Sequence, residues 1–178
     1  MGEVKLIGEY VYENARYEGG IHTSRYQATA SGIVEKIKVY NVYNGNNRVA
    51  IFSDSGSLLG ESNSTYLAGG QSGYVNLISP VLIVLGSYYW LARQADGYQG
   101  HRYRHGRTGK SKAYTYGAFP SEMGSGWSET DRGYMLEGYG TLATGGTGRL
   151  IDSPGKHPLL SGPGKHPLIS CGGNPLIG

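Results

Sequence analysis

The stretch IVEKIKVYNVYNGNNRVAIFS, residues 33–53, decides the fold class. Its apolar residues recur at every second position on both sides of a central Asn-Gly-Asn, and the inward set is Ile37, Val39, Val49 and Ile51. A period of two residues is typical of a β-strand with one buried face, and Asn-Gly is typical of a tight turn between strands. We therefore expect two antiparallel strands, residues 33–43 and 48–53, that form a hairpin.

Strand patterns continue on both sides of this hairpin. Before it, a polar loop around Gly19 and Gly20 separates two strand patterns; after it, Gly, Ser and Pro80 separate four more. The expected strands are residues 3–12, 26–30, 58–66, 74–78, 81–85 and 88–94. No stretch shows a 3.6-residue period over three turns, so we expect no substantial helix. Short strands at regular spacing predict an all-β fold, an antiparallel two-sheet β-sandwich with jelly-roll-like connections, formed by residues 1–145.

Composition supports this class and excludes others. The chain has 178 residues, of which 16% are charged, with 31 glycines and 16 tyrosines. The formal net charge is +3, and most of it lies near the C-terminus, so the body is nearly neutral and no nucleic-acid partner is expected. The single cysteine, Cys171, excludes an intrachain disulfide. The longest apolar run is far too short to cross a bilayer, so we expect no membrane insertion.

Residues 146–178 have a different pattern, which ends in RLIDSPGKHPLLSGPGKHPLISCGGNPLIG from residue 149 to residue 178. A pair of aliphatic residues recurs there at steps of 9, 9 and 8 residues, and each of the three later pairs directly follows a proline. Proline fixes φ, lacks an N–H donor and pushes the preceding residue towards extended geometry. We therefore expect an extended, Gly/Pro-rich C-terminal arm with a nine-residue repeat.

The aliphatic pairs of this arm need a host, because the arm has no second strand with which to build a core. In polyproline geometry nine residues span roughly 28 Å, which is comparable to the width of a small domain. We predict that the arm docks on neighbouring copies through Leu150, Ile151, Pro158, Leu159, Leu160, Pro167, Leu168, Ile169, Pro175, Leu176 and Ile177. The alternative is a disordered linker, although such linkers do not place Leu-Ile at a fixed period.

Three segments of the body carry a family resemblance. RVAIFSDSGSLLGES at 48–62, VNLISPVLIVLGSYYWLA at 75–92 and GSGWSETDRGY at 124–134 together resemble a widespread β-sandwich, or jelly-roll, module. Modules of this type recur in bacterial and archaeal surface proteins and in phage structural proteins. The likeness spans about residues 33–139 and implies two antiparallel sheets. It implies no catalytic residues, since the family has none in common.

The segment RQADGYQGHRYRHGRTGKSK, residues 93–112, is the most polar part of the body. Basic residues mixed with aromatics can bind phosphate, acidic glycans or single strands of nucleic acid. Alternation, however, places Arg102 and Arg104 on one face and His101, Tyr103 and His105 on the other, which favours a solvated outer strand face. Aromatic side chains can also stack on sugar rings, and the candidate glycan-binding residues are Trp90, Trp127, Tyr98 and Tyr103.

No combination of residues indicates an enzyme or a resident cofactor. The carboxylates Glu122, Glu129 and Asp131 cluster beside Trp127, where turn capping or an ion pair with Arg132 is the favoured interpretation. Glu129 and Asp131 could also hold calcium together with backbone oxygens, although no EF-hand spacing is present. We expect no other metal site.

Two functions of different classes follow from these patterns. The first is a structural subunit of a homopolymeric assembly, a virion component or an extracellular filament, whose partners are copies of itself and other virion or surface proteins. The second is a carbohydrate-binding module of a surface or secreted protein. The expected location is a virion or the cell exterior. The beginning MGEVKLIGEY has no apolar leader segment, which favours a particle assembled inside a cell.

Overall fold

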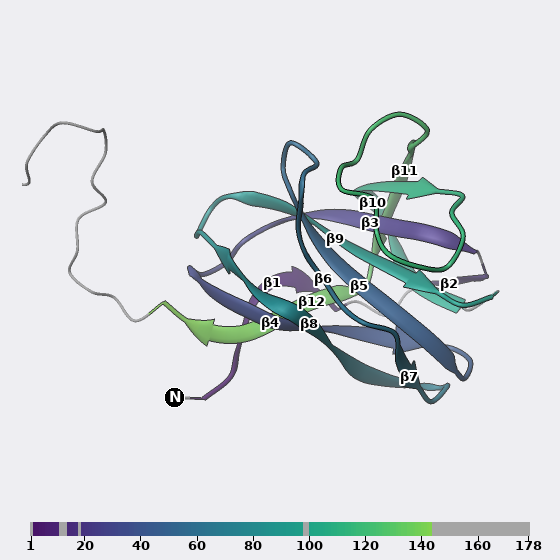
Figure 1. Cartoon of the computed structure of the whole chain (residues 1–178), viewed down its shortest axis with the longest axis horizontal. Coiled ribbons are helices and arrows are strands. Elements are labelled where there is room, and N and C mark those ends of the chain that lie inside the picture. Colours follow the sequence, from purple (N-terminus) through teal and green to yellow (C-terminus); the bar gives the residue numbers. More distant parts are fainter. Residues whose placement is uncertain (1, 11–13, 18, 98–99, 144–178) are drawn as a thin grey trace, which may run out of the picture. The chain divides into compact units, whose positions relative to one another are not determined.

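The computed structural model describes residues 2–10, 14–17, 19–97 and 100–143, and every regular element among them is a β-strand (Figure 1). The strands are β1 (Val4–Glu9), β2 (Asn14–Tyr17), β3 (Gly20–Gln27), β4 (Gly32–Asn41), β5 (Gly45–Ser53), β6 (Leu58–Glu61), β7 (Thr65–Leu67), β8 (Gln71–Ile83), β9 (Tyr88–Ala95), β10 (Gly100–Lys112), β11 (Ser128–Tyr134) and β12 (Leu136–Leu142). In the part of the chain that is described, no helix is long and apolar enough to cross a membrane.

The strands form two antiparallel sheets that pack against each other. The four-stranded sheet has the order β1-β12-β4-β8. The eight-stranded sheet has the order β11-β10-β3-β9-β5-β6, with β2 added to β10 and β7 added to β5. Every pairing is antiparallel, so the predicted all-β, two-sheet sandwich is confirmed.

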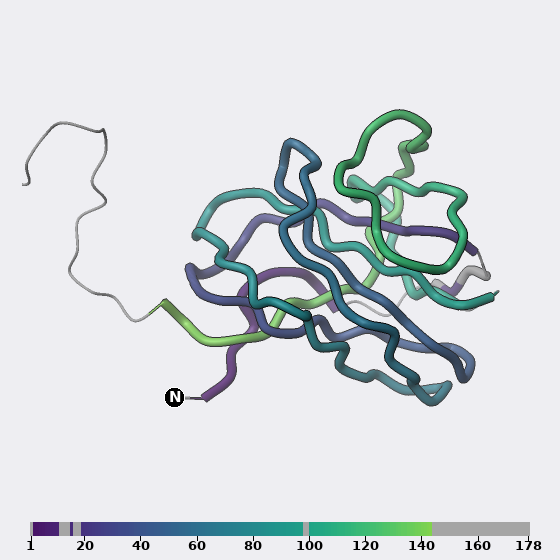
Figure 2. The backbone as a smooth tube through the Cα atoms, viewed as in Figure 1, coloured from purple at the N-terminus to yellow at the C-terminus, as the bar shows by residue number. Residues whose placement is uncertain are grey.

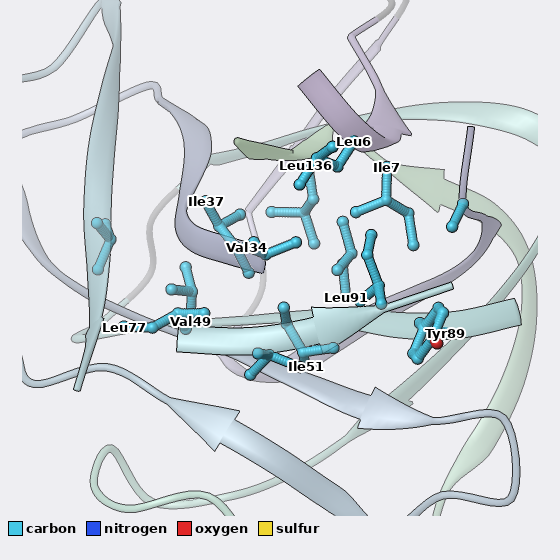
Figure 3. Close-up of a cluster of buried hydrophobic side chains, with 14 of the residues drawn as sticks. Leu6, Ile7, Val34, Ile37, Val49, Ile51, Leu77, Tyr89, Leu91 and Leu136 are labelled. Carbon is cyan, nitrogen blue, oxygen red and sulfur yellow. The ribbon is translucent and has the colours of Figure 1, made fainter. Parts of the chain in front are cut away.

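The main core lies between the two sheets, as Figure 3 shows. The predicted inward residues of the opening stretch all belong to it, because alternate side chains of a strand point to one face. Ile37 and Val39 come from the four-stranded sheet, and Val49 and Ile51 come from the eight-stranded sheet. Leu6, Ile7, Leu91 and Leu136 complete its centre.

A second, smaller core lies on the opposite face of the eight-stranded sheet. The residues between those of the main core point into it, among them Phe52 on β5 and Trp90 on β9. Phe119, from the segment that joins β10 to β11, covers them, and Trp127 from the same segment packs at its edge. The central strands are therefore buried on both faces, which explains why the run from Val49 to Phe52 is continuously apolar.

The predicted hairpin between residues 33–43 and 48–53 is wrong. β4 pairs with β8 and β12, whereas β5 pairs with β6, β7 and β9, so residues 42–44 carry the chain from one sheet to the other (Figure 2). In a hairpin both strands would lie in one sheet and point their apolar residues the same way. Here the two apolar faces oppose each other across the core, which buries both of them.

Three other strand boundaries differ from expectation. The polar loop expected near Gly20 is part of β3, whose polar residues are buried between strands on both sides. Pro80 does not end a strand: β8 runs through it, but its register with β4 shifts between the pairs Val34–Val81 and Lys36–Asn76. Proline is tolerated at such a bulge because no ladder hydrogen bond is needed there. The expected strand 58–66 is divided into β6 and β7.

One buried cation joins the two sheets where the chain crosses between them. The side chain of Arg93, on β9, is 3% exposed. Its Nε donates to Asn47 Oδ1 at 2.8 Å, its Nη1 donates to the Tyr40 carbonyl at 2.8 Å, and its Nη2 donates to Asn41 Oδ1. These acceptors lie on β5 and β4. Burial lowers the pKa of Arg93 to about 9, since all three are uncharged oxygens.

Replacing Arg93 should therefore destabilise the fold far more than replacing an exposed arginine. In Arg93→Met the three buried acceptors lose their donor, and each unsatisfied group costs about 1 to 3 kcal/mol. We expect the free energy of unfolding to fall by about 3 kcal/mol or more in urea titrations. The matched control is Arg25→Met, which breaks the exposed pair with Asp54 and should cost less than about 1 kcal/mol. Equal losses in the two variants would contradict the role given to Arg93.

Candidate interaction surfaces

The outer face of the four-stranded sheet has a polar half. Lys36 Nζ lies 4.4 Å from the ring centre of Tyr74, and Tyr74 contacts Tyr139 edge to face at 5.5 Å. Glu137 is buried beneath Lys5 and Lys38, whose Nζ atoms lie 3.3 and 3.8 Å from its carboxylate oxygens. Burial and the Glu137 carboxylate raise the pKa of Tyr139 to about 12. Each apolar ring here is covered by a cation or by another ring.

The other half of this face is apolar and open. The three register shifts of the sheet fall beside one row of paired residues, which contains Lys5, Tyr139, Lys36 and Asn76. Beyond that row Ile33 pairs with Leu82, which is 65% exposed. We call the exposed apolar residues of this region the β8 stripe; it consists of Ile33, Ile78, Leu82, Val84 and Leu85. An exposed apolar patch of this kind is typical of an interaction site.

A hollow of about 300 Å³ lies beside the β8 stripe, between the edge strands of the two sheets. Gly60 on β6 allows the close approach, because a Cβ atom there would lie 2.5 Å from Val81 Cγ2 on β8. Two of the hollow's apolar side chains, Leu59 and Ile78, are largely exposed. Its lining is Leu58, Leu59, Gly60, Glu61, Ile78 and Ser79.

A second hollow, of about 360 Å³, lies where β10 and β11 separate. The register between these strands shifts between His105 and Gly109, and the lining includes Glu129 and Asp131. The structure therefore brings the two carboxylates of the calcium prediction together, and Asp131 Oδ2 lies 2.8 Å from His105 Nδ1. No group of three or more metal ligands occurs in the described ranges. Calcium binding stays a prediction.

The hydrogen bond from His105 should be measurable in the titration of Asp131. That bond, together with the charges of His105 and Arg132, lowers the pKa of the Asp131 carboxyl below its usual 3.8. We expect NMR titration of His105→Ala to show the pKa of Asp131 moving up towards 3.8. The pKa of Asp54, which Arg25 lowers, should not move and serves as the internal control. An unchanged Asp131 in the variant would show that another group sets its pKa.

The four residues predicted to bind glycans are not brought together. Trp90 is 5% exposed inside the second core, so its ring has no open face for a sugar, and this part of the prediction is corrected. Trp127 is half-buried against Phe52, with Lys112 Nζ 5.9 Å from its ring centre. Tyr103 is half-buried beneath Arg132 and packs on the main core. Tyr98 lies outside the described residues.

Most of the basic segment 93–112 lies in β10. Only some of its side chains are exposed to solvent. His101 is buried and its ring contacts that of His22 in a tilted arrangement with ring centres 4.3 Å apart, because this face of β10 points inward. Arg104 and Arg107 both pair with Glu9, at 3.2 and 2.9 Å. Two arginines of the segment therefore share one carboxylate within the body.

Sequence reasoning missed the β8 stripe because Val81 to Leu85 reads as a continuous buried strand. The structure buries Val81 and Ile83 and exposes the residues between and after them. All residues of the predicted subunit interface, from Leu150 to Ile177, lie outside the described residues, as does the predicted domain boundary at 145/146. Those predictions therefore stay predictions. Compared with known proteins, the sequence matches no family model and no curated protein.

Proposed function

We propose that this protein is a structural subunit of a homopolymeric assembly, a virion component or an extracellular filament. One observation carries the proposal: the nine-residue repeat that places aliphatic pairs after prolines near the C-terminus. A fully buried pair contributes about 3 to 5 kcal/mol before ordering costs. Proline reduces those costs, because it restricts the arm before it binds.

The β-sandwich body is suited to be the folded part of such a subunit. The described residues alone contain two hydrophobic cores and the buried Arg93 with its three acceptors. The sandwich fold also agrees with the jelly-roll type of module found in surface and phage structural proteins, which we infer for this chain from the segments it resembles. The proposal assigns the protein no catalytic activity and no cofactor. Its partners would be copies of itself, with other virion or surface proteins.

The carbohydrate-binding alternative has one supporting observation. Several tyrosines expose their rings, and Tyr66 on β7 is 63% exposed, so stacking platforms exist outside the residues first considered. The alternative does not explain the repeat. Binding of a polysaccharide on a glycan array by the full chain, lost in Tyr66→Ala or Trp127→Ala while the melting temperature holds, would favour it.

Assembly should depend on the aliphatic pairs of the arm. In the full chain we expect Leu159→Ser with Leu168→Ser to lower the mass of the particles seen by analytical ultracentrifugation and negative-stain microscopy, because each change removes buried apolar area. The matched control is His157→Ser with His166→Ser, which alters polar residues of the same repeats and should leave assembly intact. Removal of residues 149–178 should leave a folded monomer.

If the chain without residues 149–178 still builds the same high-mass assembly, the arm is not the link between subunits and the proposal fails. If the full chain is itself monomeric at every concentration tested, the proposal fails as well. Circular dichroism of each variant would show whether the sandwich is retained.

A further inference from the structure

The β8 stripe lies along one edge of the four-stranded sheet. Along β8 the buried residues Val75, Leu77, Val81 and Ile83 alternate with exposed ones. Ile78 and Leu82 are 58% and 65% exposed, on the face where a soluble strand normally carries polar residues. Single exposed apolar residues are ordinary, but a row of them along an edge strand favours a docking surface.

The hollow beside the β8 stripe can accept side chains from another molecule. The hollow between β6 and β8 has a volume of about 300 Å³. An apolar cavity of about 150 Å³ holds a molecule of the size of benzene. The hollow is therefore large enough for two branched aliphatic side chains, and Leu59 and Ile78 would contact them.

We propose that the β8 stripe and the adjoining hollow receive an aliphatic pair from the C-terminal arm of a second copy of this chain. This inference rests on the proposed function and names the receiving surface. The occupant is suggested by the 35 residues that follow Ala143, which contain four Leu/Ile pairs. Identical pairs suit identical pockets, and identical pockets occur on identical copies.

Chain direction and charge agree with this occupant. The last described strand, β12, ends at Leu142, which pairs with Gly32 beside Ile33, so the described part of the chain ends at the end of the sheet that carries the stripe. Lys156 and Lys165 each precede an aliphatic pair by three residues. Glu35 is exposed two residues after Ile33 and forms no ion pair with another described residue, which leaves a carboxylate for an arriving lysine.

The sole native cysteine makes the contact testable in the full chain. Cys171 lies two residues after the pair Leu168-Ile169, so in Leu82→Cys a disulfide can join the arm of one copy to the stripe of another. Under mild oxidation we expect dimers and longer ladders on non-reducing gels. Glu129→Cys, exposed on the other sheet, is the matched control and should link at least about tenfold more slowly; adding Cys171→Ser should abolish the ladder.

Equal rates for Leu82→Cys and Glu129→Cys would overturn the inference. A disulfide that peptide mapping places within one chain would overturn it too, because the arm would then dock on its own body. In the double variant Leu82→Cys with Cys171→Ser, a disulfide between the position-82 cysteines of two copies would show that the stripe pairs with itself. That result would also overturn the inference.

A second experiment separates this inference from the function on which it rests. Ile78→Lys with Leu82→Lys should raise the concentration needed for assembly by at least about tenfold, without lowering the urea midpoint, because both side chains are exposed. Tyr66→Lys with Tyr114→Lys, exposed elsewhere, is the control and should assemble normally. If the arm variants lose assembly and the stripe variant keeps it, the receiving surface is wrong and the proposed function stands. If neither variant loses assembly, both are wrong.

Discussion

The buried guanidinium of Arg93 is the constraint on which the arrangement of the two sheets depends. It binds oxygens of β4 and of β5 from its place on β9, so it fixes both ends of the crossing made by residues 42–44. The nearby carboxylate of Asp96 holds the start of β5, where this crossing ends, by accepting from the backbone N–H and the side-chain amide of Asn46 at 2.7 Å each. Because a buried charge needs several well-placed acceptors, few other geometries of this crossing satisfy it.

This crossing connects a four-stranded sheet to an eight-stranded sheet, and the outer faces of the two sheets are covered differently. The outer face of the eight-stranded sheet is covered by Phe119 and its neighbours from the chain's own segment. The outer face of the four-stranded sheet has no such cover among the described residues. Its polar half is closed by contacts such as Lys36 with Tyr74, but its apolar half, with Leu82, is not. The exposed apolar surface of the four-stranded sheet, where we place the proposed partner, therefore lies at one end of that face.

The sequence predicts the strands and the fold class better than it predicts their partners. A period of two residues identifies Ile37, Val39, Val49 and Ile51 as inward, and this holds in the structure. A hairpin and a crossing between sheets produce the same period, so the pattern alone does not show that residues 42–44 are a crossing. The buried polar residues of β3 resembled a loop because their partners come from distant strands; Ser24, for instance, bonds to the backbone of Tyr134. No pattern near Arg93 in the sequence predicts its burial, since its acceptors are about fifty residues away along the chain.

An exposed apolar edge strand can cause aggregation, because strands of other molecules can pair with it. This risk is lower when the partner segment cannot itself extend a sheet. A second β8 strand could pair along the part of this edge that lies beyond the bridge between Leu77 and Ser62, and could continue to recruit copies without limit. A segment with proline before each aliphatic pair behaves differently, because proline has no N–H to donate to a ladder. Pro80 and the bulge around it shorten the regular part of the β8 edge in the same way. In the proposed assembly the prolines of the arm therefore limit each contact to one short pair, so that growth follows the geometry of the arm and not edge-to-edge pairing.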